Sequence, residues 1–394
     1  MKSVKKILAL VLAVVMIATC FAACGGDKND GKTDAKEIVI GISGPLTGGA
    51  AQYGLAVKNA AELAAKEINE AGGINGTMLK IVAADDEADS GDKATSAYNF
   101  LKDQGMQIFL GTVTTGSGLA VVNQTAADGI FQLTPSASGD DIIKAGDNCF
   151  QVCFTDSTQG SRSAQYNTEN NIASKIAVIY DSSDAYSTGI YNTFKAECTN
   201  RGITLVAEQA FTNGNTDFSA QIQACKSAGA ELVFLPIYYT EAALILKAAQ
   251  AADFAPKFFG CDGLDGILGV KGFVPALAVG VMLLTPFAAD AKDEATQSFV
   301  TAYKAAYNNE IPNQFAADAY DGVKIIAKLI EQEGITADMS AKEIGDKLKV
   351  AICSDGFEFT GLTGAGAPLT WDAEGAVSKD PAAVIIENGA YKAL

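Results

Sequence analysis

Short apolar runs alternate with longer amphipathic segments along most of this chain. The runs at 38–42, 107–110 and 175–181 show almost no alternation with polar residues, which is typical of strands buried on both faces of a parallel sheet. Polar loops follow these runs, and segments with helical spacing come next, as at 53–71 and 188–200. This alternation predicts an α/β fold in which helices cover parallel sheets.

The alternating pattern occurs twice in the 394 residues. One series runs from residue 38 to 153, and a second of similar length starts at 175 and ends near 261. Helices expected at 294–307, 314–333 and 341–350 are more than the second series needs, so some should return to the first. We therefore expect two lobes of similar architecture, in line with a chain of this length.

The stretch 111–141 contains two polar loops, each directly after an expected strand. The first holds Thr115 and leads into a helix expected to begin at Ser117 or Gly118, and the second spans 134–138. Ligands of open α/β sheets bind at this carboxyl edge, and free N–H groups at a helix start favour an anion. The stretch has no Lys or Arg, which favours a carboxylate over a phosphate, although ordinary polar loops are an equal alternative.

Composition excludes several classes of function. A net charge of −17 argues against nucleic acid as a partner, because phosphates need a basic face. Histidine is absent and no nucleophile–base pair is apparent, so we expect no enzyme. The loops at 44–49 and 111–118 miss the GxxxxGK[ST] and GxGxxG patterns, so no nucleotide cofactor is expected. The acidic run 85–89 misses EF-hand spacing, which favours a solvated loop over a calcium site, and we expect no metal.

The N-terminus has the pattern of an export signal. Three lysines precede an apolar run at 7–19 that is too short to span a bilayer. Small residues ahead of Cys24 resemble the lipobox of bacterial lipoproteins, and a plain signal peptide with a chance cysteine is the alternative. We predict a signal peptide at 1–23, then a lipidated Cys24 and a flexible linker through residue 36.

Six cysteines follow the predicted lipidation site. Export permits disulfides, but the sequence does not determine their pairing. No CxxC occurs, and we prefer free, mostly buried thiols. Cys149 and Cys153 are expected on one strand. The six are Cys149, Cys153, Cys198, Cys225, Cys261 and Cys353.

Six short segments, in this order and spacing, carry a resemblance to a known family. From about Ile38 to the C-terminus the chain resembles the bacterial type I substrate-binding proteins of ABC importers, the leucine/isoleucine/valine-binding proteins. The segments are Gly41–Gly48, Gln52–Gly54, Ala71–Gly76, Asp85–Asp86, Thr134–Ser138 and Leu369–Asp372.

The resemblance implies a type I periplasmic-binding-protein clamshell, in which two doubly wound lobes are joined by three crossovers and close over a ligand. Carried onto this chain, the crossovers fall near Phe154, Leu284 and Gly364. The implied lobes are 37–154 plus 285–364 for lobe 1, and 155–284 plus 365–394 for lobe 2.

The resemblance also implies which polar residues meet an amino-acid ligand. Thr115 and Ser138 match residues that bind its carboxylate, and Ser138 also meets the ammonium group. Ser136, with Ala137 beside it, matches a position whose carbonyl accepts from the ammonium. Asp262 matches an acid, usually Glu in the family, that pairs with the ammonium. The shorter Asp reduces the reach by about 1.5 Å, one carbon–carbon bond.

Aromatic positions complete the implied site. Tyr53 matches an aromatic beside the ligand's side chain, Tyr186 and Tyr238 match aromatics of the second lobe, and Phe315 matches a side-chain pocket position. Without the resemblance, packing of these rings in the core or on the surface would be the preferred interpretation. The disulfide of some members has no matching pair here.

The resulting hypothesis is a lipid-anchored receptor on the outer face of the cytoplasmic membrane. It would bind an aliphatic, branched-chain amino acid and deliver it to the membrane subunits of an ABC permease. Two alternatives stay open. The same fold could bind a short-chain amide, urea or another small carboxylate such as an aromatic acid, or it could act as a ligand sensor for a signalling partner.

Overall fold

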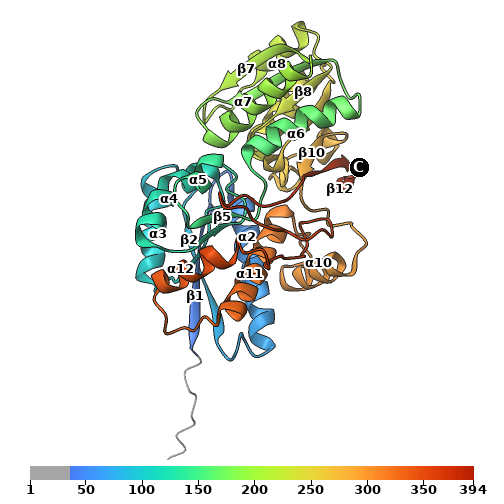
Figure 1. Cartoon of the computed structure of the whole chain (residues 1–394). Coiled ribbons are helices and arrows are strands. Elements are labelled where there is room, and N and C mark those ends of the chain that lie inside the picture. The colour runs from blue at the N-terminus through green and yellow to red at the C-terminus, as the bar shows by residue number, and fades with distance from the viewer. Residues whose placement is uncertain (1–35) are drawn as a thin grey trace, which may run out of the picture. The chain divides into compact units, whose positions relative to one another are not determined.

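The computed structural model describes residues 36–394 (Figure 1). The predicted signal peptide at 1–23 and the predicted lipidation at Cys24 lie outside the described residues. Alternating strands and helices build two separate sheets, as the sequence predicted.

The first sheet is parallel throughout and has the strand order β2-β1-β3-β4-β5. In β1 the side chains of Ile38, Ile40 and Ile42 on one face are fully buried, and Gly41 and Ser43 on the other face are buried too, as in a strand covered on both faces. The strands are β1 (Glu37–Gly44), β2 (Met78–Asp85), β3 (Ile108–Leu110), β4 (Gln132–Thr134) and β5 (Cys149–Gln151).

The second sheet has the order β12-β11-β10-β9-β8-β6-β7. Its strands pair in parallel from β7 to β10, whereas β11 and β12 form an antiparallel hairpin at the edge. The strands are β6 (Lys175–Asp181), β7 (Thr204–Phe211), β8 (Leu232–Leu235), β9 (Lys257–Gly260), β10 (Met282–Thr285), β11 (Ala382–Glu387) and β12 (Ala390–Ala393).

Helices cover both sheets, and we call the parts built on the first and second sheets lobe 1 and lobe 2. Lobe 1 contains α2 (Ala51–Glu70), α3 (Asp92–Asp103), α4 (Thr115–Asp128), α5 (Asp140–Lys144), α10 (Glu294–Ala306), α11 (Gln314–Glu333) and α12 (Ala341–Ala351). Lobe 2 contains α6 (Asp156–Glu169), α7 (Ala185–Asn200), α8 (Ser219–Ser227) and α9 (Tyr239–Ala251), with short 3₁₀ turns after β9.

Helices α10, α11 and α12 belong to lobe 1, as was predicted because the second series had no need of so many helices. Figure 1 shows α11 and α12 beside the first sheet, and α11 packs along α2. The Tyr307 hydroxyl, just after α10, donates to the Asn59 carbonyl of α2 at 2.6 Å. The chain thus passes between the lobes three times, after β5, after β10 and after α12.

Helix α6 was not expected from the sequence. Its residues are mostly polar, so they show no apolar helical stripe. Thr155 caps the helix by accepting the Thr158 N–H. Gly160 lets α6 lie against α7, because a Cβ at this position would meet the Ile190 carbonyl oxygen at 2.5 Å.

Two details of the sequence prediction are wrong near the first strand ends. Helix α4 begins at Thr115 rather than at Ser117 or Gly118. The acidic loop is only partly solvated, because Asp86 is fully buried and accepts from the Ser43 hydroxyl at 2.8 Å. The carboxylates of Asp85 and Asp86 accept hydrogen bonds within the loop and so stabilise it. Within residues 36–394 no cluster of acidic, Cys or His side chains is arranged to hold a metal ion.

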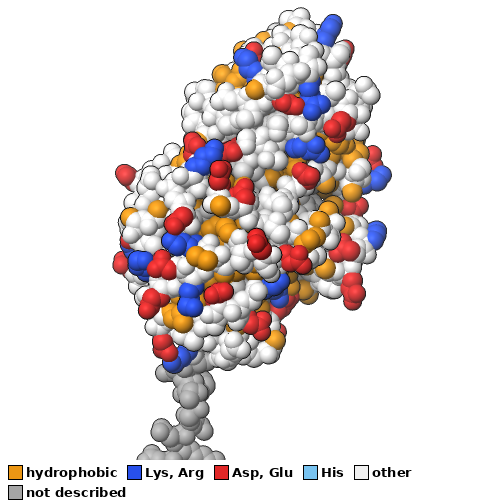
Figure 2. All heavy atoms as spheres, viewed as in Figure 1, with side chains coloured by type: hydrophobic (Ala, Val, Ile, Leu, Met, Phe, Trp, Pro, Cys, Tyr) orange, Lys and Arg blue, Asp and Glu red, His pale blue; other side chains and the backbone are white. Residues whose placement is uncertain are grey.

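The six cysteines are free thiols, and all but Cys353 are buried, as preferred from the sequence. Only Cys149 lies in β5, which ends before Cys153. On the face seen in Figure 2, basic side chains are scattered among acidic ones rather than gathered into a patch. None of the helices between residues 36 and 394 is long and apolar enough to cross a membrane.

Candidate functional site

The two lobes touch through the start of α2 and the start of α9. The Tyr53 hydroxyl in α2 donates to the Gly263 carbonyl and accepts the Tyr239 N–H, the latter at 3.3 Å. Nearby, the Thr240 hydroxyl donates to the Gly49 carbonyl at 2.8 Å. These bonds hold the lobes against each other in this conformation.

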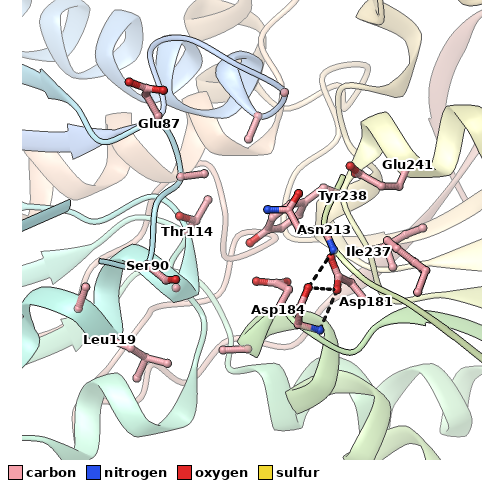
Figure 3. Close-up of a pocket in the computed structure, with 18 residues that line it drawn as sticks. Glu87, Ser90, Thr114, Leu119, Asp181, Asp184, Asn213, Ile237, Tyr238 and Glu241 are labelled. Atoms are coloured by element: carbon pink, nitrogen blue, oxygen red, sulfur yellow. Dashed lines mark hydrogen bonds between the residues drawn. The ribbon is translucent and has the colours of Figure 1, made fainter. Parts of the chain in front are cut away.

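A cleft of about 420 Å³ opens between the lobes beside these contacts (Figure 3). In the figure, Glu87, Ser90, Thr114 and Leu119 approach it from lobe 1. The residues labelled on the side of lobe 2 are Asp181, Asp184, Asn213, Ile237, Tyr238 and Glu241. The outer cleft is therefore acidic on both sides.

The two polar loops of lobe 1 lie side by side, as predicted. The Gly139 N–H, after the second loop, donates to the Thr115 hydroxyl oxygen at 3.1 Å. The Ser136 hydroxyl donates to the Val113 carbonyl of the first loop at 2.7 Å. Both loops follow adjacent parallel strands, β3 and β4, so the sheet itself brings them together.

The start of α4 offers donors to an anion. Thr114 precedes the helix, but its side chain caps no backbone N–H and instead donates to the Ser117 hydroxyl at 3.1 Å. First-turn N–H groups of a helix have no partner within it, and they carry its positive dipole end. The Thr115 hydroxyl accepts from Gly139, which leaves its own proton for a ligand.

Ser138, predicted to meet both ends of the ligand, contacts a carboxylate of the other lobe. Its hydroxyl donates to the Asp156 carboxylate at 2.6 Å, so this proton is engaged. The remaining lone pairs suit an ammonium group better than a carboxylate. In this arrangement the backbone N–H groups of α4 and Thr115 are left as the donors to an anion.

Asp262 lies in lobe 2, at the start of the turn η1 (Asp262–Leu264) after β9. It is 4% exposed and accepts from the Tyr186 hydroxyl at 2.6 Å. Burial raises the pKa of Asp262 to about 7, although the bond from Tyr186 favours the charged form. A neighbouring cation would lower this pKa again.

Asp156 is a second buried carboxylate, and no pattern in the sequence indicated it. It starts α6, is 2% exposed, and faces Ser138 on the opposite lobe. Burial raises its pKa, and the negative charge of Asp262 raises it further. Among the described residues neither acid forms an ion pair, so the site can accept a cation from outside.

Gln159 on α6 was also missed. Its side-chain oxygen accepts the Asp262 N–H at 3.2 Å, while its buried Nε2 has no hydrogen-bond partner. An unused buried donor is costly, so Nε2 is available to a ligand oxygen. Because α6 itself was not recognised in the sequence, nothing indicated that Asp156 and Gln159 would share one helix face.

The predicted aromatic residues form one cluster. Tyr53 packs on Phe315 with ring centroids 4.2 Å apart, and Tyr186 stacks on Tyr238 at 5.1 Å. Tyr53 also meets Tyr238 edge to face at 5.6 Å, which joins the two pairs across the lobes. Tyr239, not anticipated from the sequence, packs on Tyr53 at 4.8 Å.

Most predicted ligand residues lie deeper than the open cleft. Of these residues only Tyr238 lines the cavity of Figure 3, and Thr115 lies next to Thr114 of its wall. Ala137 is fully buried behind Ser136 and Ser138, and its carbonyl accepts from Gln151 at 3.1 Å. The predicted site is thus a buried region behind Tyr238, between the lobes.

Two sheets joined by three crossovers around a cleft define a two-lobed ligand-binding protein. The profile of the family described as periplasmic binding protein matches residues 37–368, and the chain belongs to this family. Such binding proteins of transporters are exported and are not enzymes as a class.

Comparisons with individual proteins agree with the family. The chain is 35% identical to the Leu/Ile/Val-binding protein homolog 3 of Brucella melitensis, over 77% of this chain and 82% of that protein. It is 29% identical to the solved branched-chain amino acid transporter substrate-binding protein LivJ of Streptococcus pneumoniae in complex with isoleucine. That match has a TM-score of 0.80 and covers 91% of this chain and 98% of LivJ.

The same fold also occurs in binding proteins for other small molecules. A solute-binding protein of an ABC transporter from R. palustris, solved in complex with benzoate, superimposes with a TM-score of 0.79. The match covers 91% of this chain and 95% of that chain, at 20% sequence identity. At this identity the likeness concerns the fold alone.

Proposed function

We propose that this protein binds an aliphatic, branched-chain amino acid between its lobes and delivers it to an ABC permease. The names of its relatives in Brucella melitensis and Streptococcus pneumoniae support the ligand class. One observation supports this proposal most directly. Hydrogen-bond donors for an anion lie on one side of the interlobe region, and a carboxylate that can bind a cation lies on the other. Helix α4 presents N–H donors from lobe 1, and Asp262 presents a buried carboxylate from lobe 2.

A zwitterion suits this arrangement. Its carboxylate would take the α4 N–H groups and the Thr115 hydroxyl, and its ammonium would take Asp262, the Ser136 carbonyl and the Ser138 hydroxyl oxygen. The aliphatic side chain would lie against Tyr53 and the rings packed on it. Because the two charged ends need different lobes, only the closed state satisfies both, and the ligand favours closure by that difference in affinity.

Membrane attachment and delivery belong to the same proposal. Lipidation at Cys24 would anchor the exported protein through the linker that ends at residue 36. The support for this step is the sequence pattern of the N-terminus together with the transporter context of the relatives.

One alternative has a specific observation in its favour. The aromatic cluster could stack on an aromatic acid, and the benzoate-binding protein from R. palustris shares the fold. The two uncompensated acids, Asp156 and Asp262, argue against it, since benzoate brings no cation. A neutral amide or urea would likewise leave both acids without a counter-charge. A role as sensor for a signalling partner would use the same site.

Calorimetric titration tests the proposal. Protein refolded to remove bound ligand is titrated with the twenty amino acids, isobutyramide, urea and benzoate. We expect leucine, isoleucine or valine to bind most tightly, with one molecule per chain. Tight binding of benzoate or of an amide, with no response to any amino acid, would overturn the proposed ligand class.

A further inference from the structure

The turn η1, which carries Asp262, is anchored within lobe 2 through its N–H groups. The Asp262 N–H donates to the side-chain oxygen of Gln159 at 3.2 Å, and the Gly263 N–H donates to the Tyr186 hydroxyl at 2.9 Å. The same hydroxyl donates to the Asp262 carboxylate at 2.6 Å. Lobe 2 thus binds the donors of this turn and the carboxylate that projects from it.

The carbonyl groups of the same turn accept from lobe 1. The side-chain amide of Gln314 donates to the Asp262 carbonyl at 3.0 Å, and the Tyr53 hydroxyl donates to the Gly263 carbonyl. Gln314 is the first residue of α11 and is only 1% exposed, whereas Tyr53 lies in α2. Two helices of lobe 1 therefore reach the turn of lobe 2 on which the proposed ammonium site is built.

The backbone of Gln314 adds a further bond to lobe 2. The N–H of a first helical residue has no partner within its helix, and it lies at the positive end of the helix dipole. In α11 this N–H donates to the carboxylate of Asp265 at 3.0 Å, and Asp265 is itself buried. Gln314 thus binds both ends of the segment 262–265, so it fixes the orientation of that segment as well as its distance from lobe 1.

We propose that Gln314 is a positioning residue of the ligand site, which holds the segment 262–265 against lobe 1 and so sets the Asp262 carboxylate where it meets the ligand. This role rests on the proposed function, since the ligand concerned is the amino acid of that proposal. Gln314 acts through Asp262 and needs no contact with the ligand. Because its bonds join the two lobes, they stabilise the closed state, and they must break before an enclosed ligand leaves. Gln314 should therefore govern dissociation more than association.

The size of the effect follows from one neutral hydrogen bond. The Asp262 carbonyl also accepts the Asp265 N–H at 2.9 Å, so loss of the Gln314 amide leaves this carbonyl with one partner rather than none. A neutral bond of this kind changes an equilibrium constant by about two- to tenfold. Gln314→Met keeps the length and the helix preference of the side chain. It should raise the dissociation rate of leucine, and with it the Kd, by about that factor.

Gln107→Met is the matched control. The side-chain amide of Gln107 also donates to a backbone carbonyl, that of Met339 at 2.8 Å, but both residues belong to lobe 1. This change should lower the urea midpoint of unfolding and leave the dissociation rate of leucine within about 1.5-fold of wild type. Gln314→Met should show the reverse pattern, with faster dissociation at a urea midpoint no lower than that of the control.

The dissociation rate is measured on the whole purified protein, loaded with tritiated leucine and chased with excess unlabelled leucine. Calorimetry gives the Kd, and the association rate follows from the two values. In Gln314→Met the association rate should stay within about twofold of wild type. An unchanged dissociation rate would overturn the role of Gln314. The same acceleration in Gln107→Met, or a loss of affinity that lies entirely in association, would overturn it too.

Two further variants make the test independent of any one substitution. Gln314→Asn keeps the amide but shortens its reach by about 1.5 Å, one carbon–carbon bond, so it should accelerate dissociation as Gln314→Met does, and it replaces that variant if the latter does not fold. Asp265→Ala removes the acceptor of the Gln314 N–H and should also accelerate dissociation. If the wild-type protein binds another ligand of the calorimetric panel instead of leucine, the proposed ligand class fails. The same rates measured with that ligand then still decide the role of Gln314.

Discussion

Replacing Asp262 by Asn tests the proposed ammonium site with little change in shape. The amide oxygen can still accept from the Tyr186 hydroxyl, which now lies 2.6 Å from the carboxylate. What disappears is the negative charge opposite the ligand's ammonium. Leaving one partner of such a buried pair unpaired costs about 2–5 kcal/mol, which corresponds to a loss of affinity of about 30-fold to several thousand-fold.

The pH dependence of binding provides a sharper form of this test. Burial raises the pKa of Asp262 to about 7 in the protein without ligand. Below pH 7 the carboxyl is protonated, so an ammonium ligand must displace the proton. The Kd should therefore rise as the pH falls below 7, by at most about tenfold per unit for one proton. Above pH 7 it should be nearly constant.

Calorimetry between pH 5.5 and 8.5, in buffers of different ionisation heat, counts the protons released on binding. The wild-type protein should release close to one proton near pH 6, and Asp262→Asn should release fewer. Protons that the variant still releases would come from Asp156 and from Asp184 of the cleft, because burial also raises the pKa of both acids. Glu87→Gln removes an exposed acid of the outer cleft and serves as the matched control. An Asp262→Asn protein that binds leucine within threefold of wild type would refute the reasoning.

Three further predictions concern other parts of the molecule. Lys379→Met removes the base paired with buried Asp318, at 3.0 Å, and should lower the free energy of unfolding by about 3–5 kcal/mol in urea titrations. A loss below about 1 kcal/mol would contradict an effective ion pair. Gly160→Ala places a Cβ 2.5 Å from the Ile190 carbonyl oxygen and should cost about 1–3 kcal/mol by the same measurement, whereas an unchanged midpoint would mean that α6 can shift freely. Cys24→Ser should abolish incorporation of labelled fatty acid and release the protein from membranes in fractionation, and retained labelling would refute lipidation at this residue.

The fold was predictable because its elements carry strong periodic signals. Helix α11 matches the expected range 314–333, and strand β6 matches 175–181. In α11 one apolar face is buried over the whole length, and Asn313 and Gly334 mark its two ends with a side-chain cap and a left-handed residue. Such local signals do not depend on tertiary context.

Helix α6 lacks such a signal. The site residues that lie on this helix could therefore not be predicted from the sequence either. Its buried face consists of polar and small residues, among them Asp156, Gln159 and Ser163, that become buried only because the other lobe and α7 cover them. The burial of Asp86 has the same origin, because its carboxylate is stabilised by Ser43 from a different strand. Polar residues that face one another across a tertiary contact have no pattern along the sequence.

The proposed function explains why acids without a counter-charge are buried in the interlobe region. Asp156 and Asp262 are both buried, the charge of Asp262 disfavours ionisation of Asp156, and no cation of the described residues pairs with either acid. Without ligand this burial weakens the closed state. An ammonium group between the acids would remove the penalty, so most of the ligand's stabilising effect would appear only when the lobes meet. A protein arranged in this way would stay open until occupied, and a permease that recognises the closed shape would then select the loaded form.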